Sequence, residues 1–166
     1  MLESRLEFTL PDPLATDRLG AALARAWSDS GQGSAVVYLQ GELGAGKTTC
    51  VRSLLHALGV EGLIRSPTYT LVEAYPLPSI LCVHVDLYRL QGPLEVDELG
   101  LRDYFDGDCL LLVEWPERGA DAVPPADLGL TLEYLGNARR CRMIAHTGRG
   151  RLWLDSFTAG TPMLSA

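Results

Sequence analysis

The sequence lacks the features of a membrane or exported protein. No apolar run approaches the roughly 18 residues that a membrane-spanning helix needs. Residues 1–10 carry charges where a signal peptide would have its apolar stretch. The 166 residues, 47% of them hydrophobic, include no low-complexity tract and fit one globular domain over 1–166. These absences predict a cytoplasmic protein with no membrane partner. The segment 147–166 matches no known motif, and the sequence does not indicate its role.

The cysteines and histidines form no metal-binding or disulfide pattern. No C-x-x-C pair is present, and most of the cysteines lie in apolar runs, where a free thiol packs as a small hydrophobic group. The spacing therefore disfavours zinc ligation and disulfide bonds. The residues concerned are Cys50, Cys82, Cys109, Cys141, His56, His84 and His146.

The chain also lacks the excess positive charge of a nucleic-acid-binding protein. Its net charge is −7 and its pI is about 4.9, so RNA or DNA would repel the protein as a whole. Any role near nucleic acid is therefore expected to run through a partner protein. Arginines gather locally at 139–142 and again at Arg149 and Arg151. This pattern favours a solvated strand edge protected by charge over a binding patch.

Lysine is nearly absent, and the exception is informative. The chain contains 13 arginines but one lysine, Lys47, which lies in the string GELGAGKT at residues 41–48. The string matches G-x-x-x-x-G-K-[ST], the phosphate-binding loop of nucleoside triphosphatases. A compact ammonium fits beneath such a loop and reaches the β- and γ-phosphates, whereas a planar guanidinium would clash. The predicted nucleotide-binding residues of the loop are Gly41, Glu42, Leu43, Gly44, Ala45, Gly46, Lys47 and Thr48.

The surroundings of this loop are those that the motif requires. Residues 35–40 form a short apolar run that predicts a buried parallel strand. Residues 47–58 have helical apolar spacing, and Gly59 is a suitable stop. The loop glycines would turn backbone N–H groups toward phosphate, and the helix dipole would point at the same charge. Thr48 would supply a hydroxyl that binds Mg²⁺.

The remaining pattern predicts an α/β fold of the P-loop type. An edge strand is expected at 5–10, and Thr16 is a suitable cap for the helix that follows. Pro93 opens a helical stretch that Gly100 interrupts, and alternation over 128–134 and 141–145 predicts an antiparallel hairpin. We expect a three-layer sandwich with a central mixed, mainly parallel sheet and this C-terminal hairpin. A proline-marked turn that leads into a β-rich run is predicted at 66–75, and further strands are predicted at 81–86 and 109–114.

Two predicted strands end in a carboxylate. Asp86 closes the apolar run 81–86, and Glu114 closes the run 109–114. Ligands of open α/β sheets bind beyond the carboxyl ends of the strands. A carboxylate there can hold Mg²⁺ directly or through water, or orient an attacking water. The alternative for either residue alone is a helix cap or a surface acid, and the sequence does not decide which one touches a metal.

Two further features have a functional and an ordinary interpretation. Residues 66–69, Ser-Pro-Thr-Tyr, lie where a nucleotide-sensing switch loop would lie, but an ordinary capped turn fits equally well. Trp115 directly follows Glu114 and is either a core aromatic residue or a mobile plate beside a nucleotide.

Missing motifs narrow the function. There is no N-K-x-D for reading guanine, so ATP is favoured over GTP. No arginine-dense lid follows the third buried strand, as a small-molecule kinase would need, and Arg102 and Arg118 are isolated. The alternatives to an ATPase are therefore a small-molecule P-loop kinase, which this absence disfavours, and a binding module that uses ATP only as a structural ligand.

Taken together, these motifs resemble the TsaE (YjeE) family over nearly the whole chain. After the N-terminal helix come, in order, GELGAGKTT, SPTYTLVEAY, HVDLYRL, ELGLRDYF and LVEWPE. The loop is widespread among proteins, but SPTYTLVE, DLYRL and VEWPE at these spacings are much more specific. One departure is Glu42, where the family commonly has Asp.

The resemblance implies a small P-loop ATPase of tRNA threonylcarbamoyladenosine synthesis that hydrolyses ATP slowly on its own. Such proteins work with the TsaB–TsaD pair, which modifies an adenosine beside the tRNA anticodon, so contact with tRNA would be indirect. By position, Thr48 and Glu114 match magnesium ligands, Lys47 the phosphate clamp and Asp86 an acid near the nucleotide. Thr49 and Trp115 fall at functional positions. The implied cofactors are ATP and Mg²⁺, and the implied catalytic residues are Lys47, Asp86 and Glu114.

Overall fold

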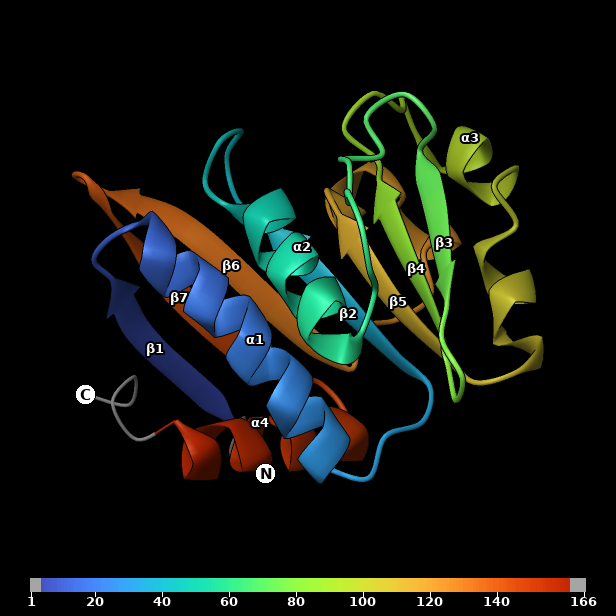
Figure 1. Ribbon diagram of the computed structural model, residues 1–166. Coiled ribbons are helices and arrows are strands. Elements are labelled where there is room, and N and C mark those ends of the chain that lie inside the picture. The colour runs from blue at the N-terminus through green and yellow to red at the C-terminus, as the bar shows by residue number, and fades with distance from the viewer. Residues whose placement is uncertain (1–3, 162–166) are drawn as a thin grey trace.

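The structure, a computed structural model, describes residues 4–161 and is drawn in Figure 1. The strands are β1 (Arg5–Leu10), β2 (Ala35–Gln40), β3 (Val72–Pro76), β4 (Leu81–Asp86), β5 (Cys109–Glu114), β6 (Leu128–Leu135) and β7 (Ala138–Ala145). The α-helices are α1 (Pro13–Asp29), α2 (Lys47–Leu58), α3 (Pro93–Asp97) and α4 (Gly148–Gly160). Short 3₁₀ helices are η1 (Leu101–Asp106), η2 (Pro116–Arg118) and η3 (Ala120–Ala122).

Within the described residues, all seven strands form one mixed sheet in the order β1-β7-β6-β2-β5-β4-β3. The central strands β6, β2, β5 and β4 are parallel. The buried apolar runs predict this for β2, β5 and β4, whereas the parallel pairing of β6 with β2 was not predicted. Antiparallel strands lie on both sides: β3 pairs with β4, and β1 and β6 flank β7. The mixed sheet with a parallel centre, the edge strand at 5–10 and the C-terminal hairpin are therefore confirmed.

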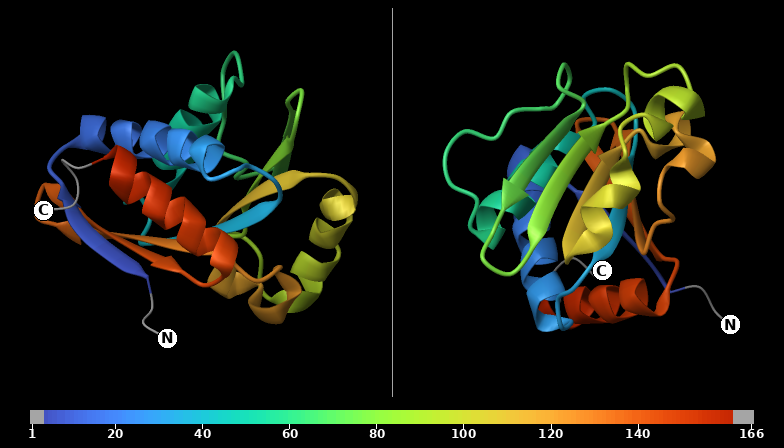
Figure 2. Two further views of the ribbon diagram at one scale, coloured as in Figure 1. Left: turned by 90° about the horizontal axis from the view of Figure 1, so that it is seen from below. Right: turned by 90° about the vertical axis from the view of Figure 1, so that its right-hand side faces the viewer.

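The sheet carries a helical layer on each face, which confirms the three-layer sandwich (Figures 1 and 2). Helices α1, α2 and α4 share one core with Val37, Leu39 and Leu112, whereas α3 and η1 share the other with Val36 and Leu111. Neighbouring residues of β2 and β5 thus point into different cores. Both faces of β2, β4 and β5 are largely buried, which is why these strands are apolar without alternation, whereas β6 alternates.

The helix ends differ from the prediction in one place. Helix α1 begins at Pro13 and is capped by Asp12, whose Oδ1 accepts the N–H of Ala15 at 2.8 Å. Proline at the first helical position fits because its missing N–H would have no partner there. The prediction that Thr16 caps this helix was wrong, and Thr16 lies buried inside it.

The C-terminal helix was not anticipated. Thr147 caps α4 by accepting the N–H of Gly150 at 3.1 Å, and Trp153, Leu154 and Phe157 are buried against the core. The first three residues of α4 read Gly-Arg-Gly, which carries no helical signal in the sequence. Part of the segment 147–166, residues 162–166, lies outside the described residues, as do residues 1–3 of the N-terminal segment.

Arg140 and Arg142 lie on an open sheet face rather than on an edge, whereas Arg139 lines a hollow beside the glycine loop. The predicted edge was wrong, because β1 pairs along β7 and takes the edge position itself. Arg142 Nε lies 3.1 Å from a Glu7 carboxylate oxygen, and Arg140 lies between Glu7 and Glu133. Arginine and glutamate thus alternate across these strands.

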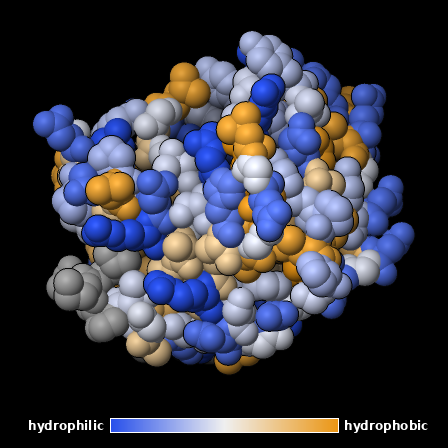
Figure 3. All heavy atoms as spheres, viewed as in Figure 1, coloured by the Kyte–Doolittle hydropathy of each residue, from blue (hydrophilic) through white to orange (hydrophobic). Residues whose placement is uncertain are grey.

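Among residues 4–161, no helix is both long and apolar enough to cross a membrane. On the face of the molecule in Figure 3, polar side chains separate small groups of apolar ones.

Helices α1 and α2 pack closely against each other at Gly20, which gives a first prediction. A Cβ there would lie 2.8 Å from Ser53 Cβ and 2.9 Å from Leu54 N, and it would also collide with the Cys50 carbonyl. In an open helix, Gly→Ala stabilises by about 1 kcal/mol. Here Gly20→Ala should destabilise by about 1–3 kcal/mol, because the helices must move apart.

Urea unfolding measures this change in free energy, and Gly148→Ala is the matched control. A Cβ at Gly148, in the first turn of α4, has no neighbour within 4 Å. The control should leave stability unchanged or slightly raised. Equal stability of the Gly20→Ala variant and the unsubstituted protein would contradict the close helix crossing.

Candidate functional site

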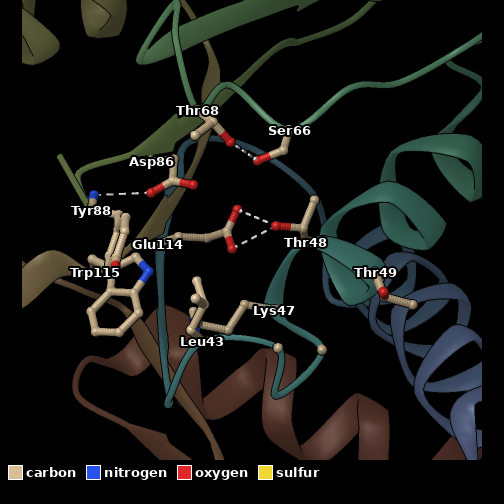
Figure 4. A pocket seen from close by; sticks show the side chains of 12 residues that line it. Leu43, Lys47, Thr48, Thr49, Ser66, Thr68, Asp86, Tyr88, Glu114 and Trp115 are labelled. Carbon is tan, nitrogen blue, oxygen red and sulfur yellow. Dashed lines mark hydrogen bonds between the residues drawn. The ribbon is translucent and has the colours of Figure 1, made fainter.

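A cavity of about 250 Å³ opens where β2, β4 and β5 end, beside the start of α2 (Figure 4). Residues far apart in the sequence meet there, as expected for the carboxyl edge of a parallel sheet. The cavity is lined by Leu43, Gly44, Gly46, Lys47, Thr48, Thr49, Ser66, Thr68, Asp86, Tyr88, Glu114 and Trp115.

The loop that follows β2 depends on glycine. Gly41, Gly44 and Gly46 have φ values of 146°, 79° and 110°, which side chains disfavour. A Cβ on Gly41 would also strike the carbonyl oxygen of Leu132. The β6–β7 hairpin braces the loop, because Tyr134 donates its hydroxyl to the Leu43 carbonyl at 2.7 Å. The loop therefore keeps a curved backbone at the N-terminus of α2, a geometry suited to binding phosphate.

Lys47 is buried beneath the loop and lies at 5% exposure. Its Nζ donates to the carbonyls of Gly41 at 2.5 Å and of Glu42 at 2.9 Å. Burial lowers the pKa of Lys47, and the negative charges of Glu114 and Asp86 oppose this effect. Among the described residues that line the cavity, Lys47 is the sole cation. Its ammonium group is thus held where an anion in the loop would meet it.

Thr48 and the two strand-end acids form the opposite wall. Asp86 and Glu114 are register partners on the neighbouring strands β4 and β5. Thr48 Oγ1 donates to Glu114 Oε1 at 2.8 Å and to Oε2 at 3.0 Å, and Figure 4 shows the two side chains pointing toward each other. Asp86 Oδ1 accepts the N–H of Tyr88 at 3.0 Å.

These three side chains offer only oxygen atoms as metal ligands, from one hydroxyl and two carboxylates, and such ligands fit the hard cation Mg²⁺. Within residues 4–161, no cluster of three or more histidine, cysteine or acidic side chains forms a closed metal cage. An Mg²⁺ ion here would complete its shell with water and phosphate, as it commonly does.

The other predicted residues lie around this centre. Gly41 and Glu42 do not line the cavity but contribute the carbonyls that Lys47 binds. Ala45 faces a second hollow, of about 220 Å³, on the other side of the loop. Thr49 lines both hollows. The hydroxyls of Ser66 and Thr68 lie at the rim, 2.8 Å apart.

Trp115 is neither a fully buried core residue nor remote from the site. It has φ 57°, a left-handed conformation that is unusual for a tryptophan. The centroid of its ring lies 4.4 Å from Lys47 Nζ and 5.0 Å from the centroid of the Tyr88 ring. The guanidinium of Arg118, which appeared isolated in the sequence, lies 5.9 Å from the same ring. The Trp115 ring therefore packs against the Lys47 ammonium.

Sequence reasoning missed His84. Its Nε2 lies 2.6 Å from Glu114 Oε2, and both side chains are buried. His84 precedes Asp86 by two residues, so the alternation of a strand puts both on one face of β4. That spacing was the available signal, but it points to Glu114 only once β4 and β5 are known to be neighbours.

The burial of Asp86 gives a second prediction. Burial raises the pKa of its carboxyl above 3.8, the Tyr88 N–H opposes this shift, and Glu114 adds to it. The folded protein therefore holds this proton more tightly than the unfolded chain, and ionisation of Asp86 destabilises the fold as pH rises. At pH 7, Asp86→Asn should raise the melting temperature by about 2–4 °C, since a gain of about 1 kcal/mol has this effect at this size.

Thermal unfolding followed between pH 3.5 and pH 8 tests this expectation. The gain should be full above the raised pKa of Asp86 and should vanish below its ordinary value of 3.8. Asp155→Asn, at an exposed position within α4, makes the same charge change away from the site and should have little effect. A lower melting temperature for Asp86→Asn at pH 7 would contradict the inferred strain.

A strand, a glycine-rich loop, a helix and two strand-end acids in this order define a P-loop α/β protein. The model of the family "Threonylcarbamoyl adenosine biosynthesis protein TsaE" matches residues 10–142. The chain belongs to the TsaE family, whose members act in tRNA threonylcarbamoyladenosine biosynthesis.

Individual relatives agree with this assignment. The TsaE protein of Haemophilus influenzae is 39% identical over 95% of this chain and 99% of its own length. That of Synechocystis is 43% identical over 71% of this chain and 74% of its own. The crystal structure of Bacillus subtilis YdiB superposes with a TM-score of 0.79 at 24% identity, covering 96% of this chain and 97% of its own. This last likeness supports the fold.

Proposed function

We propose that this protein binds ATP with Mg²⁺ at the glycine loop and hydrolyses it as an accessory ATPase of tRNA threonylcarbamoyladenosine synthesis. The observation that carries the proposal is the convergence of Lys47, Thr48, Asp86 and Glu114 on one cavity. The buried cation can bind phosphate oxygens directly. The other three groups are oxygen ligands on the facing wall and can hold the Mg²⁺ that accompanies a polyphosphate.

Each group has a distinct task in this proposal. The backbone N–H groups of the loop and the Lys47 ammonium bind the phosphate oxygens. Thr48 and Glu114 hold Mg²⁺, which supplies neutralisation of phosphate charge when bound. Asp86, at the end of β4, orients water at the cavity, because its carboxylate is held by the Tyr88 N–H and still lines the cavity.

In this proposal, the nucleoside of ATP lies in the second hollow. It shares Gly44, Gly46 and Thr49 with the first cavity, so the two adjoin across the loop. A triphosphate lying along the loop with its terminal phosphate at Glu114 would leave the base and ribose on this side. Asn137 and Arg139 from the hairpin line the hollow and offer polar groups to them.

The proposed partners are proteins of the TsaB and TsaD type, with tRNA contacted only through them. A net charge of −7 disfavours direct contact with tRNA. The arginines on the open sheet face are paired with Glu7 and Glu133, which leaves little unbalanced positive charge there. The family assignment supports this pathway.

Phosphate release, measured with and without a TsaB–TsaD pair, tests the proposal. We expect slow release by the protein alone and faster release with the partners. A small-molecule kinase would instead transfer the phosphoryl group to an added acceptor, and a pure binding module would release no phosphate under either condition. Either of these results would overturn the proposed function.

A further inference from the structure

His84 occupies a position that a packing role does not explain. The residue is 0% exposed, Glu114 is 2% exposed, and the Nε2–Oε2 distance is 2.6 Å. Strand β4 places Asp86 beside Glu114 and His84 one step behind, opposite Leu112. His84 contacts Glu114 but does not line the cavity.

The hydrogen bonds around Glu114 fix its carboxylate from two directions. Thr48 on α2 donates to both carboxylate oxygens, and His84 on β4 holds Oε2. A glutamate has three side-chain torsions, so a carboxylate without such partners would turn between several orientations. With them, the carboxylate of Glu114 is held in one orientation at the wall of the cavity.

The pattern of partners also settles which ring nitrogen carries the hydrogen. A carboxylate can only accept, so Nε2 of His84 must donate to Glu114. Within the described residues, the buried Nδ1 atom has no hydrogen-bond partner. A hydrogen on Nδ1 would be buried without an acceptor, which is unfavourable. The geometry therefore points to the tautomer with its hydrogen on Nε2.

We propose that His84 is a positioning residue for Mg²⁺, which orients Glu114 through the Nε2 hydrogen bond without touching metal or nucleotide. This inference rests on the proposed function and deepens it. Partners that orient a metal ligand from behind commonly change metal affinity by about 10–100-fold when removed. Two hydrogen-bond donors, Thr48 on α2 and His84 on β4, would thus both fix the orientation of Glu114 as a metal ligand.

A pair of variants of similar side-chain volume separates this role from packing. His84→Gln keeps an N–H donor at about the position of Nε2, whereas His84→Met fills the space without one. The readout is the MgCl₂ concentration that gives half-maximal binding of a fluorescent ADP analogue, measured without hydrolysis. His84→Met should need about tenfold more Mg²⁺, and His84→Gln should stay within about twofold of the unsubstituted protein.

Cys82→Ala is the matched control. Cys82 lies on β4 two residues before His84, on the same face, and is fully buried in the same way. It does not contact Glu114, so the variant should lose stability without changing the Mg²⁺ requirement. In EDTA, all variants should bind the ADP analogue within about threefold of one another, because the loop and Lys47 are intact.

The outcomes separate the two proposals. An unchanged Mg²⁺ requirement in His84→Met, or equal losses in His84→Met and His84→Gln, would overturn the role of His84. Failure of the unsubstituted protein to bind the analogue would instead overturn the proposed function. If His84→Met does not fold, nitrogen NMR of the unsubstituted protein decides: the inference requires the hydrogen on Nε2, and a hydrogen on Nδ1 alone overturns it.

Discussion

Replacing Lys47 with alanine is expected to weaken ATP binding at least about a hundredfold, which corresponds to about 2.8 kcal/mol. Two effects add. The variant loses the sole cation that lines the cavity among the described residues. It also leaves the carbonyls of Gly41 and Glu42 without their donor, so the loop loses the group that holds it curved. Charge-assisted hydrogen bonds of this kind are stronger than neutral ones.

Titration calorimetry with ATP and Mg²⁺ measures this loss, and two further variants sharpen it. Arg52→Ala removes a positive charge from the same helix, but Arg52 Nε donates to the Ile64 carbonyl and does not line the cavity. Its affinity should stay within about twofold of the unsubstituted protein. Lys47→Arg should bind poorly despite its charge, because a planar guanidinium does not fit beneath the loop. Unchanged affinity in Lys47→Ala would mean that nucleotide binds elsewhere.

The second large effect is expected at Thr48. Thr48→Val keeps the shape of the side chain but removes the hydroxyl that donates to both oxygens of Glu114. The site then loses one proposed Mg²⁺ ligand and one of the two groups that orient the other. We expect phosphate release with the TsaB–TsaD pair to fall about a hundredfold, because metal-assisted hydrolysis needs both.

Thr48→Ser is the matched control, since it keeps the hydroxyl and loses only a methyl group. Its rate should stay within a few fold of the unsubstituted protein. ATP binding in EDTA should be similar in both variants because Lys47 and the loop remain. A Thr48→Val variant that hydrolyses ATP at the unsubstituted rate would show that Thr48 has no part in holding the metal.

Much of the fold could be predicted because each element at its centre has a recognisable pattern within one continuous stretch of sequence. Strands β2, β4 and β5 are buried on both faces and therefore appear as unbroken apolar runs. Helix α2 begins at Lys47 and ends before Gly59, whose φ of 109° favours glycine. Helix α4 was missed although Trp153, Leu154 and Phe157 have helical spacing, because the segment begins with Gly-Arg-Gly and its glycines disfavour a helix.

Part of the candidate site could be predicted for similar reasons. Lys47 and Thr48 are adjacent in one motif, and the proximity of Asp86 to Glu114 follows from two strands ending at one sheet edge. The His84–Glu114 contact depends on the register between β4 and β5, which no local pattern reveals. The approach of Trp115 to Lys47 depends likewise on a left-handed backbone turn at Trp115.

The most direct test of a nucleotide site at the glycine loop is a crystal structure with Mg²⁺ and a non-hydrolysable ATP analogue. The phosphates should lie against the backbone N–H groups of residues 44–48, with Lys47 Nζ on the terminal phosphates and the metal beside Thr48 Oγ1 and Glu114. A crystal at saturating analogue in which the loop holds no phosphate, or in which the analogue lies away from Lys47, would contradict the account.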